Sequence, residues 1–238
     1  MVRSQLILKT LLHIETATDV CSVALSSGGK VIAEQSSSEK LSHASELMPL
    51  INRLLDNIGI QPSDLDAVSV SSGPGSYTGL RIGVSTAKGI AYALNIPLIA
   101  VGSLQSAAAG ILDLSNPSDD DLIIPMIDAR RMEVFMAVYN RQLKELKASS
   151  PLIVDESSFE EWLPGRIIFG GSGAAKLKTM FGANPNVVFV DGNIHNAAYA
   201  AKLAFARFEA GEFDNTAYFE PVYGKEFVAG APKVKGLR

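Results

Sequence analysis

Residues 13–25 read HIETATDVCSVAL, and residues 126–138, which read MIDARRMEVFMAV, align with them without a gap. In this alignment Glu15 meets Asp128. Each segment has the pattern of a strand that ends in an acid, a turn, and a second strand with alternating apolar residues. The two segments therefore indicate an internal duplication, separated by about half of the chain.

The order of elements continues to match beyond this segment. Ala24 meets Ala137, and each copy goes on to a polar turn and a third strand. A helix, an apolar strand with a Gly/Ser loop, a second helix, another strand and a final helix follow in both copies. The helices are expected at 45–57, 79–95 and 103–114 in the first copy, and at 156–165, 174–182 and 196–211 in the second.

This order of elements predicts an α/β fold with two lobes. Three neighbouring antiparallel strands begin each copy, and the strand–helix–strand units that follow build parallel sheets with helices on their faces. Two such units side by side leave a cleft between them. We expect a first lobe at 1–113, a polar linker at 114–121, a smaller second lobe at 122–211, and a C-terminal tail of little regular structure at 212–238.

Composition narrows the functional classes. The 238 residues carry a net charge of −4, so the chain lacks the basic footprint with which a protein holds a nucleic-acid backbone by itself. No apolar run reaches the roughly 18 residues of a membrane span. Lys9 interrupts the apolar N-terminal run, and no secretory signal is expected. The lone Cys21 excludes an intramolecular disulfide and fits a small buried side chain, so we expect a cytoplasmic protein.

The loop SSGPGSYTG, residues 71–79, opens directly into a helix. Backbone N–H groups at a helix N-terminus can bind an anion, and glycines such as Gly73 and Gly75 allow close approach. The glycine spacing matches neither the dinucleotide fingerprint nor a P-loop, which favours a tight turn over a nucleotide site. Glu15 and Asp128, at equivalent strand ends beside the expected cleft, are candidates for positioning Mg²⁺ or water. Both also fit turn-forming acids.

The histidines do not suggest a hydrolase or a metal centre. A serine nucleophile needs a base within reach, and the sequence contains no G-x-S-x-G motif. His13 lies inside a strand-like run and is expected to be packed. His43 and His195 are at helix starts, where capping or surface roles are expected. His43 and Glu46 together offer only two metal ligands.

The helix at 79–95 carries small residues every four positions, at Gly79, Gly83, Ala87 and Ala91. Glycine costs a helix interior about 1 kcal/mol relative to alanine, so this stripe indicates a close approach of another backbone. Two interpretations remain open. The stripe either seats the helix on its own sheet or meets a helix of a partner. Residues of the opposite face, Arg81, Ser85 and Lys88, favour contact with a partner.

Three segments carry a resemblance to a known family. ILKTLLHIETATDVCSVAL (7–25), HASELMPLINRLL (43–55) and SSGPGSYTGLRIGVSTAKGIAYALNIPLIAVGSL (71–104) resemble the TsaB family. The resemblance implies the duplicated ASKHA fold, which is actin-like and ribonuclease-H-like, with three antiparallel strands plus parallel strands and helices in each lobe. It also implies a non-catalytic subunit required for threonylcarbamoyl transfer to the tRNA adenosine adjacent to the anticodon.

The catalytic relatives, the TsaD family, carry two metal-binding histidines in an H-x-x-x-H motif. Here those positions fall on Ser103 and Ala107, which cannot replace imidazole at a metal. The resemblance therefore implies a paralogue without the chemistry, which binds and activates TsaD together with the ATPase TsaE. It implies a homodimer when the chain is alone, indirect contact with tRNA, no cofactor in the isolated chain, and ATP or ADP only at the level of the complex.

The same resemblance places a partner interface on the first two helices. The expected interface residues are Leu47, Leu50, Ile51, Leu54, Gly79, Arg81, Ile82, Gly83, Ser85, Thr86, Ala87 and Ile90. An alternative function is an ASKHA-type phosphotransferase or ATPase that uses Glu15 and Asp128 in the interlobe cleft. Fold kinship by itself does not distinguish these functions.

Overall fold

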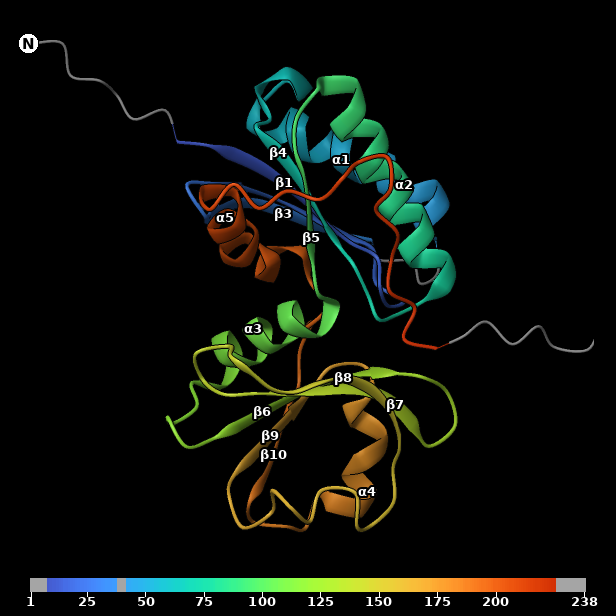
Figure 1. The fold of residues 1–238 in the computed structure, drawn as a ribbon, viewed down its shortest axis with the longest axis vertical. Helices are drawn as coiled ribbons and strands as arrows, with labels where there is room; N and C mark the ends of the chain where they lie inside the picture. Colours follow the sequence, from blue (N-terminus) through green and yellow to red (C-terminus); the bar gives the residue numbers. More distant parts are fainter. Residues whose placement is uncertain (1–7, 38–41, 226–238) are drawn as a thin grey trace, which may run out of the picture.

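The computed structural model describes residues 8–37 and 42–225. These residues form two lobes, each built around a five-stranded sheet, which are stacked one above the other in Figure 1. Strands and helices follow the predicted order in the first half of the chain and, apart from the helix expected at 156–165, in the second half. The predicted duplicated α/β architecture is therefore confirmed.

The sheet of the first lobe has the strand order β3-β2-β1-β4-β5. The first three strands are antiparallel neighbours, whereas β1, β4 and β5 run parallel. β4 and β5 are buried along their whole length, as expected for parallel strands covered on both faces. The strands are β1 Thr10–Glu15, β2 Ser22–Ser27, β3 Lys30–Ser36, β4 Ala67–Ser71 and β5 Leu98–Val101.

Two long helices cover one face of this sheet. Helix α1 (His43–Ile58) packs on β2, and α2 (Tyr77–Leu94) packs on β4. Gly59 caps the C-terminus of α1, and its φ of 72° lies in the left-handed region that is common at this position. A short 3-10 helix, η1 (Pro62–Asp64), leads from α1 into β4.

The sheet of the second lobe has the order β10-β9-β6-β7-β8 and repeats the first. Its strands are β6 Leu122–Asp128, β7 Glu133–Tyr139, β8 Glu145–Ile153, β9 Ile167–Gly170 and β10 Val187–Val190. Its helices are short, η2 (Ala174–Leu177) and α4 (Lys178–Phe181). The expected helix at 156–165 is wrong. The Asp155 carboxylate accepts bonds from Ser157 and Ser158, and the chain forms successive turns that bury Phe159.

The two hairpins of the repeat differ by one residue. Glu15 lies opposite Ser22, whereas Asp128 lies opposite Val134, so the second turn is shorter. The gapless alignment is therefore correct for β1 and β6 but wrong beyond the turn. The structural counterpart of Ala24 is therefore Met136 and not Ala137. Such a one-residue slip matters because it exchanges the two faces of a strand.

The last helix of each copy packs on the other copy's sheet. Helix α3 (Ser103–Ser115) lies between the lobes and contacts β6 (Figure 1). Helix α5 (Ala201–Glu209), preceded by η3 (Ala197–Ala200), packs instead on the first sheet, where Ala204 is buried. The expected lobes at 1–113 and 122–211 thus exchange their last helices, which the pattern of the sequence does not reveal.

The described part of the tail, residues 212–225, contains no helix or strand apart from one bridge between Leu98 and Asp214. It descends beside α2 toward the second lobe in Figure 1. The rest of the expected tail, residues 226–238, lies outside the described part. None of the described helices is long and apolar enough to cross a membrane.

Candidate functional site at the lobe junction and helix α2

The two candidate acids occupy equivalent positions and make equivalent local bonds. Glu15 ends β1, and its carboxylate accepts the N–H of Ala17 at 2.6 Å. Asp128 ends β6 and accepts the N–H of Arg130 at 2.6 Å. Each acid therefore holds the turn that follows its own strand, so the turn-forming interpretation is confirmed for both.

Their surroundings differ. The Glu15 side chain is buried, and burial raises the pKa of its carboxyl to about 7, although the N–H of Ala17 and the hydroxyl of Ser71 oppose this shift. The Asp128 side chain is half exposed and pairs with Lys176 Nζ at 2.8 Å. The equivalent strand ends thus carry a buried carboxyl group in the first lobe and a carboxylate paired with a lysine in the second.

Three backbone N–H groups of the loop at 71–76 donate to other groups of the chain. Ser72 N donates to the Val101 carbonyl at 2.8 Å, and Ser76 N donates to the Ala17 carbonyl at 2.7 Å. Gly73 N donates to the hydroxyl of Ser103 at 3.0 Å. These amides are not available to a phosphate. The contacts favour a tight turn over an anion cradle.

Glycines of this loop and of α2 face the chain's own β1–β2 turn. A Cβ on Gly75 would lie 2.3 Å from the Ala17 carbonyl oxygen, and one on Gly79 would lie 2.1 Å from that of Thr16. A Cβ on Gly83 would lie 2.2 Å from the Thr16 hydroxyl. The small-residue stripe therefore seats α2 on its own lobe, which decides between the two interpretations that the sequence left open.

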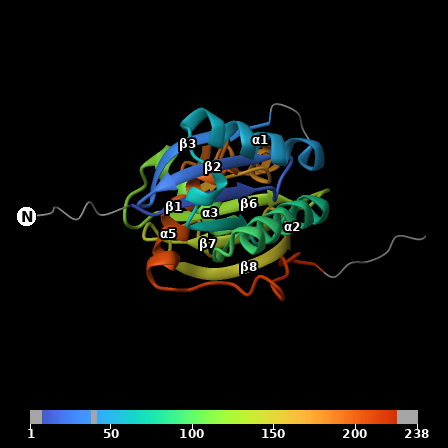
Figure 2. The same ribbon diagram turned by 90° about the horizontal axis from the view of Figure 1, so that it is seen from above.

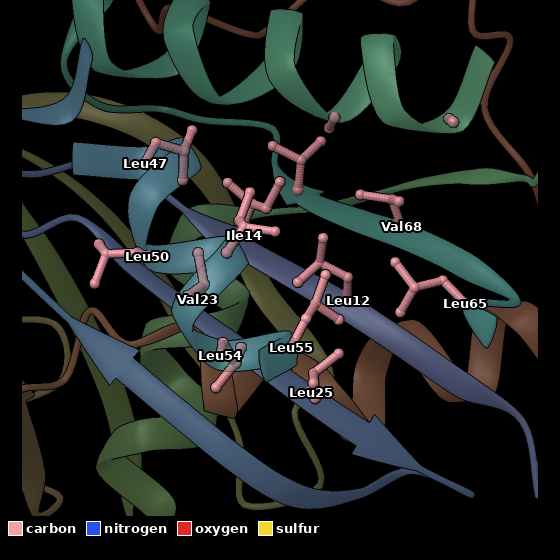
Figure 3. Packing of buried hydrophobic residues seen from close by; sticks show 14 of the residues in the cluster. Leu12, Ile14, Val23, Leu25, Leu47, Leu50, Leu54, Leu55, Leu65 and Val68 are labelled. Carbon is pink, nitrogen blue, oxygen red and sulfur yellow. The ribbon is translucent and has the colours of Figure 1, made fainter. Parts of the chain in front are cut away.

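The expected partner interface requires correction at seven positions. The α1 residues Leu47, Leu50, Ile51 and Leu54 are at most 2% exposed and belong to one buried cluster with residues of the sheet. Figure 3 shows Leu47, Leu50 and Leu54 within this cluster. Gly79, Gly83 and Ala87 are buried residues of α2 itself. These residues belong to the core of the lobe because the apolar stripe of an amphipathic helix is also the stripe that seats it.

The outward face of α2 is different. Arg81 and Ser85 are exposed, whereas Ile82, Thr86 and Ile90 are partly buried. The exposed strip of α2 consists of Thr78, Arg81, Ser85, Gly89 and Tyr92. Figure 2 shows α2 between α1 and the tail. A groove of about 530 Å³ between α2 and the tail is lined by Lys88, Gly89, Tyr92, Asn215, Thr216 and Ala217.

The tail makes contacts with α2 that local sequence patterns do not predict. Lys88 Nζ donates to the carbonyls of Ala217 and Phe219, each at 3.1 Å. Arg81 Nε donates to the Tyr223 hydroxyl at 3.2 Å. The partners are more than 120 residues apart in the chain, so only the tertiary structure reveals them.

The histidines are all buried. His13 lies between the hydroxyls of Ser69 and Ser26 at 2.6 and 2.7 Å, and burial lowers its pKa to about 3. The packed role predicted for this residue is confirmed. The expectation that His43 and His195 are surface or capping residues is wrong, because each ring bonds the backbone of a distant segment. The described residues contain no group of three or more potential metal-ligating side chains.

The start of α3 is fastened to the loop. Ser103 and Ala107 are at most 1% exposed. The Ser103 hydroxyl accepts the Gly73 N–H, and the Ser103 N–H donates back to the Gly73 carbonyl at 2.9 Å. This reciprocal pair gives Ser103 a structural role at the lobe junction.

Comparison with known proteins gives consistent matches. The family model for TsaD, described as tRNA N6-adenosine threonylcarbamoyltransferase, matches residues 30–221. The chain is similar to the tRNA threonylcarbamoyladenosine biosynthesis protein TsaB of Escherichia coli, with 31% identity over 92% of this chain and 96% of that protein. The protein of the same name from Bacillus subtilis is 41% identical, but the match spans only about half of its length, 55%.

Solved structures share the architecture. A Pseudomonas aeruginosa protein, described as uncharacterized with similarity to peptidase YeaZ, has a TM-score of 0.75 at 27% identity, over 91% of this chain and 100% of that one. A ROK hexokinase from Thermus thermophilus, 11% identical over 85% of this chain and 100% of that one, has a TM-score of 0.51 and shares the fold alone. These similarities confirm the predicted ASKHA fold.

Proposed function

The chain belongs to the TsaB family, and we propose that it acts in threonylcarbamoyladenosine biosynthesis as a non-catalytic subunit that binds and activates a TsaD-type paralogue. The name of the Escherichia coli relative, matched over nearly its whole length, supports the pathway. In this proposal a TsaE-type ATPase acts alongside, the isolated chain forms a homodimer, and the role is cytoplasmic because tRNA is modified there.

The observation that carries the non-catalytic part is the start of α3. The TsaD resemblance would place metal-binding histidines at Ser103 and Ala107, and both residues are buried here. The Ser103 hydroxyl is already engaged with the Gly73 N–H. An imidazole that reached a metal at either position would need space that the loop and the helix now fill.

The contacts at the strand ends argue against a phosphotransferase. A site for MgATP needs free carboxylates for the metal and free N–H groups for the phosphates. Asp128 is paired with Lys176. The amides of Ser72, Gly73 and Ser76 bond within the chain. We therefore favour the partner-subunit proposal over the nucleotide enzyme.

One similar solved structure is described as having similarity to a peptidase, and a serine peptidase needs a serine paired with a histidine. His13 and Ser69 do form such a pair, at 2.6 Å. Both side chains are buried inside the sheet of the first lobe, and the other ring nitrogen of His13 bonds Ser26 rather than a carboxylate. This arrangement lacks both access for a substrate and the acid that orients a catalytic histidine.

We place the partner face on the exposed strip of α2, flanked by α1 and the tail. The centre of this strip is open, because a Cβ on Gly89 would meet no atom within 4 Å. Tyr92 beside it is 84% exposed, and Met48 of α1 is 45% exposed. Exposed aromatic and methionine side chains around an open helix surface suit the docking of another helix.

The test is association with a TsaD-type partner, measured by size-exclusion chromatography with light scattering and by tRNA modification. Gly89→Leu is expected to abolish the mixed complex and the modification while the free chain keeps its fold. Lys202→Leu on α5 is the matched control, because this exposed residue lies on the opposite face of the first sheet. A wild-type chain that forms no complex and turns over MgATP alone would overturn the proposal in favour of the phosphotransferase.

A further inference from the structure

The turn between β6 and β7 places two consecutive arginines in an unusual backbone conformation. Arg130 has φ of 70° and Arg131 has φ of 49°. Side chains with a Cβ rarely adopt this left-handed region, and hairpin turns that need it ordinarily use glycine or asparagine. Two arginines at such positions favour a role for their side chains over a role in forming the turn.

Lys176 holds this turn in place. Its ammonium group donates to the Asp128 carboxylate at 2.8 Å, to the Arg131 carbonyl at 2.9 Å and to the Glu133 carbonyl at 2.7 Å. The same Asp128 carboxylate accepts the Arg130 N–H. The side chain of Lys176 is 17% exposed, whereas that of Asp128 is half exposed. The strained turn is therefore fixed in one shape.

The side chains of Arg130 and Arg131 are exposed to solvent. Within the described part of the chain, neither the Arg130 nor the Arg131 side chain makes a hydrogen bond or an ion pair with another residue. A guanidinium carries five donors arranged to bind phosphate oxygens in pairs. The turn thus presents two adjacent unpaired cations on a fixed support.

The acids around the turn are already engaged. Asp128 is paired with Lys176, and Glu133 is paired with Lys225 of the tail. Asp155, which follows the neighbouring strand, accepts bonds from the hydroxyl groups of its own turn. These bonds leave the two arginines free for a ligand, although the chain as a whole has a net charge of −4.

We propose that Arg130 and Arg131 contact the phosphate backbone of RNA directly, which replaces the indirect contact with tRNA that the family resemblance implies. In the context of the proposed function this RNA is the tRNA substrate of the complex. The side chains stand on an open turn, and the described cavity between the lobes, of about 300 Å³, is lined by other residues, including Gln105 and Tyr139. An open pair of arginines suits an extended polyanion better than an enclosed nucleotide. Such contacts position the RNA without reading its bases.

The test uses the complex with the TsaD-type partner and an unmodified tRNA transcript, titrated at several salt concentrations. Arg130→Asn combined with Arg131→Gly removes both cations and supplies residues that accept positive φ. We expect this variant to raise the melting temperature of the free chain, to weaken tRNA binding on the order of tenfold, and to reduce the slope of log Kd against log salt by about 1–2.

The matched control removes the same charge from the same lobe. Arg141→Gln combined with Lys144→Gln changes the turn at the other end of β7, where Arg141 pairs with Asp119. We expect wild-type tRNA affinity and salt dependence for this variant. Arg130→Lys combined with Arg131→Lys should keep most of the salt slope.

Two outcomes would overturn the inference. One is a variant with raised stability and unchanged tRNA binding, which would leave the arginines a purely structural role. The other is MgATP binding by the free chain that is lost in the variant. Complex formation with the partner is measured on the same samples, so failure of this RNA contact is distinguishable from failure of the proposed function.

Discussion

At the scale of single residues, burial decides what the candidate acids can do. Glu15 and Asp128 follow the same strand in the two copies and hold the same kind of turn. The first is enclosed by its lobe, and its pKa is raised, whereas the second is neutralised by Lys176. The sequence predicts the pair correctly but cannot predict this difference, because neither the enclosure nor the lysine is local.

The raised pKa of Glu15 predicts a pH-dependent effect on stability. The unfolded carboxyl ionises near pH 4.5, whereas the folded one holds its proton to about pH 7. Between these values the folded state binds more protons, so its stability falls as pH rises. We expect the free energy of unfolding of Glu15→Gln, relative to the wild type, to increase by about 3 kcal/mol between pH 4.5 and pH 8.

Urea unfolding at several pH values measures this difference. The buried histidines, whose lowered pKa values act in the opposite direction, are the same in both proteins and cancel in the comparison. Glu34→Gln, on an exposed position of β3, is the matched control. Parallel stability curves for Glu15→Gln and the wild type would show that Glu15 has the same protonation in both states.

At the scale of elements, α2 has two faces with different tasks. Its glycine face lies against the β1–β2 turn, and its outer face carries the exposed strip beside the tail. The four-residue spacing of small residues predicts that α2 packs closely against another segment, but it does not predict which segment this is. This is why Gly83→Leu would displace α2 from its own lobe and is no selective test of partner binding.

Two alanine substitutions separate these faces. Gly79→Ala is expected to lower the free energy of unfolding by about 2 kcal/mol, because its Cβ would meet the Thr16 carbonyl at 2.1 Å. Gly89→Ala is expected to raise it by up to ~1 kcal/mol, because the position is open and alanine favours the helix. Denaturant unfolding of both variants checks the signs. Equal effects would contradict the two-faced description of α2.

At the scale of the whole molecule, the lobes are interdependent. Helix α5 covers the face of the first sheet that holds Leu11 and Ile99, and α3 packs on the second sheet. The tail adds a connection between the lobes, since Val222 N donates to the Ser72 carbonyl and Lys225 pairs with Glu133. A lobe taken as a continuous segment therefore lacks one of its covering layers.

This interdependence predicts that residues 1–118 do not fold alone. Without α5 the face around Ile99 would be exposed, and we expect binding of a hydrophobic dye and no cooperative unfolding transition. The full chain is expected to unfold in one transition. Joining residues 194–214 to the fragment through a flexible linker should restore cooperativity. A fragment that unfolds cooperatively without them would contradict the prediction.

The family resemblance rests on the residues of three long segments. Beside it, the sequence predicts the duplication, the equivalence of Glu15 and Asp128 and, apart from the helix expected at 156–165, the order of strands and helices. These features follow from hydrophobic periodicity and turn residues, which act over a few positions along the chain. The tertiary structure decided the other questions, among them the burial of Leu47 and Leu50, the one-residue difference between hairpins, the exchange of α3 and α5, and the course of the tail. These depend on contacts between residues that meet only when the chain folds, so no local pattern encodes them.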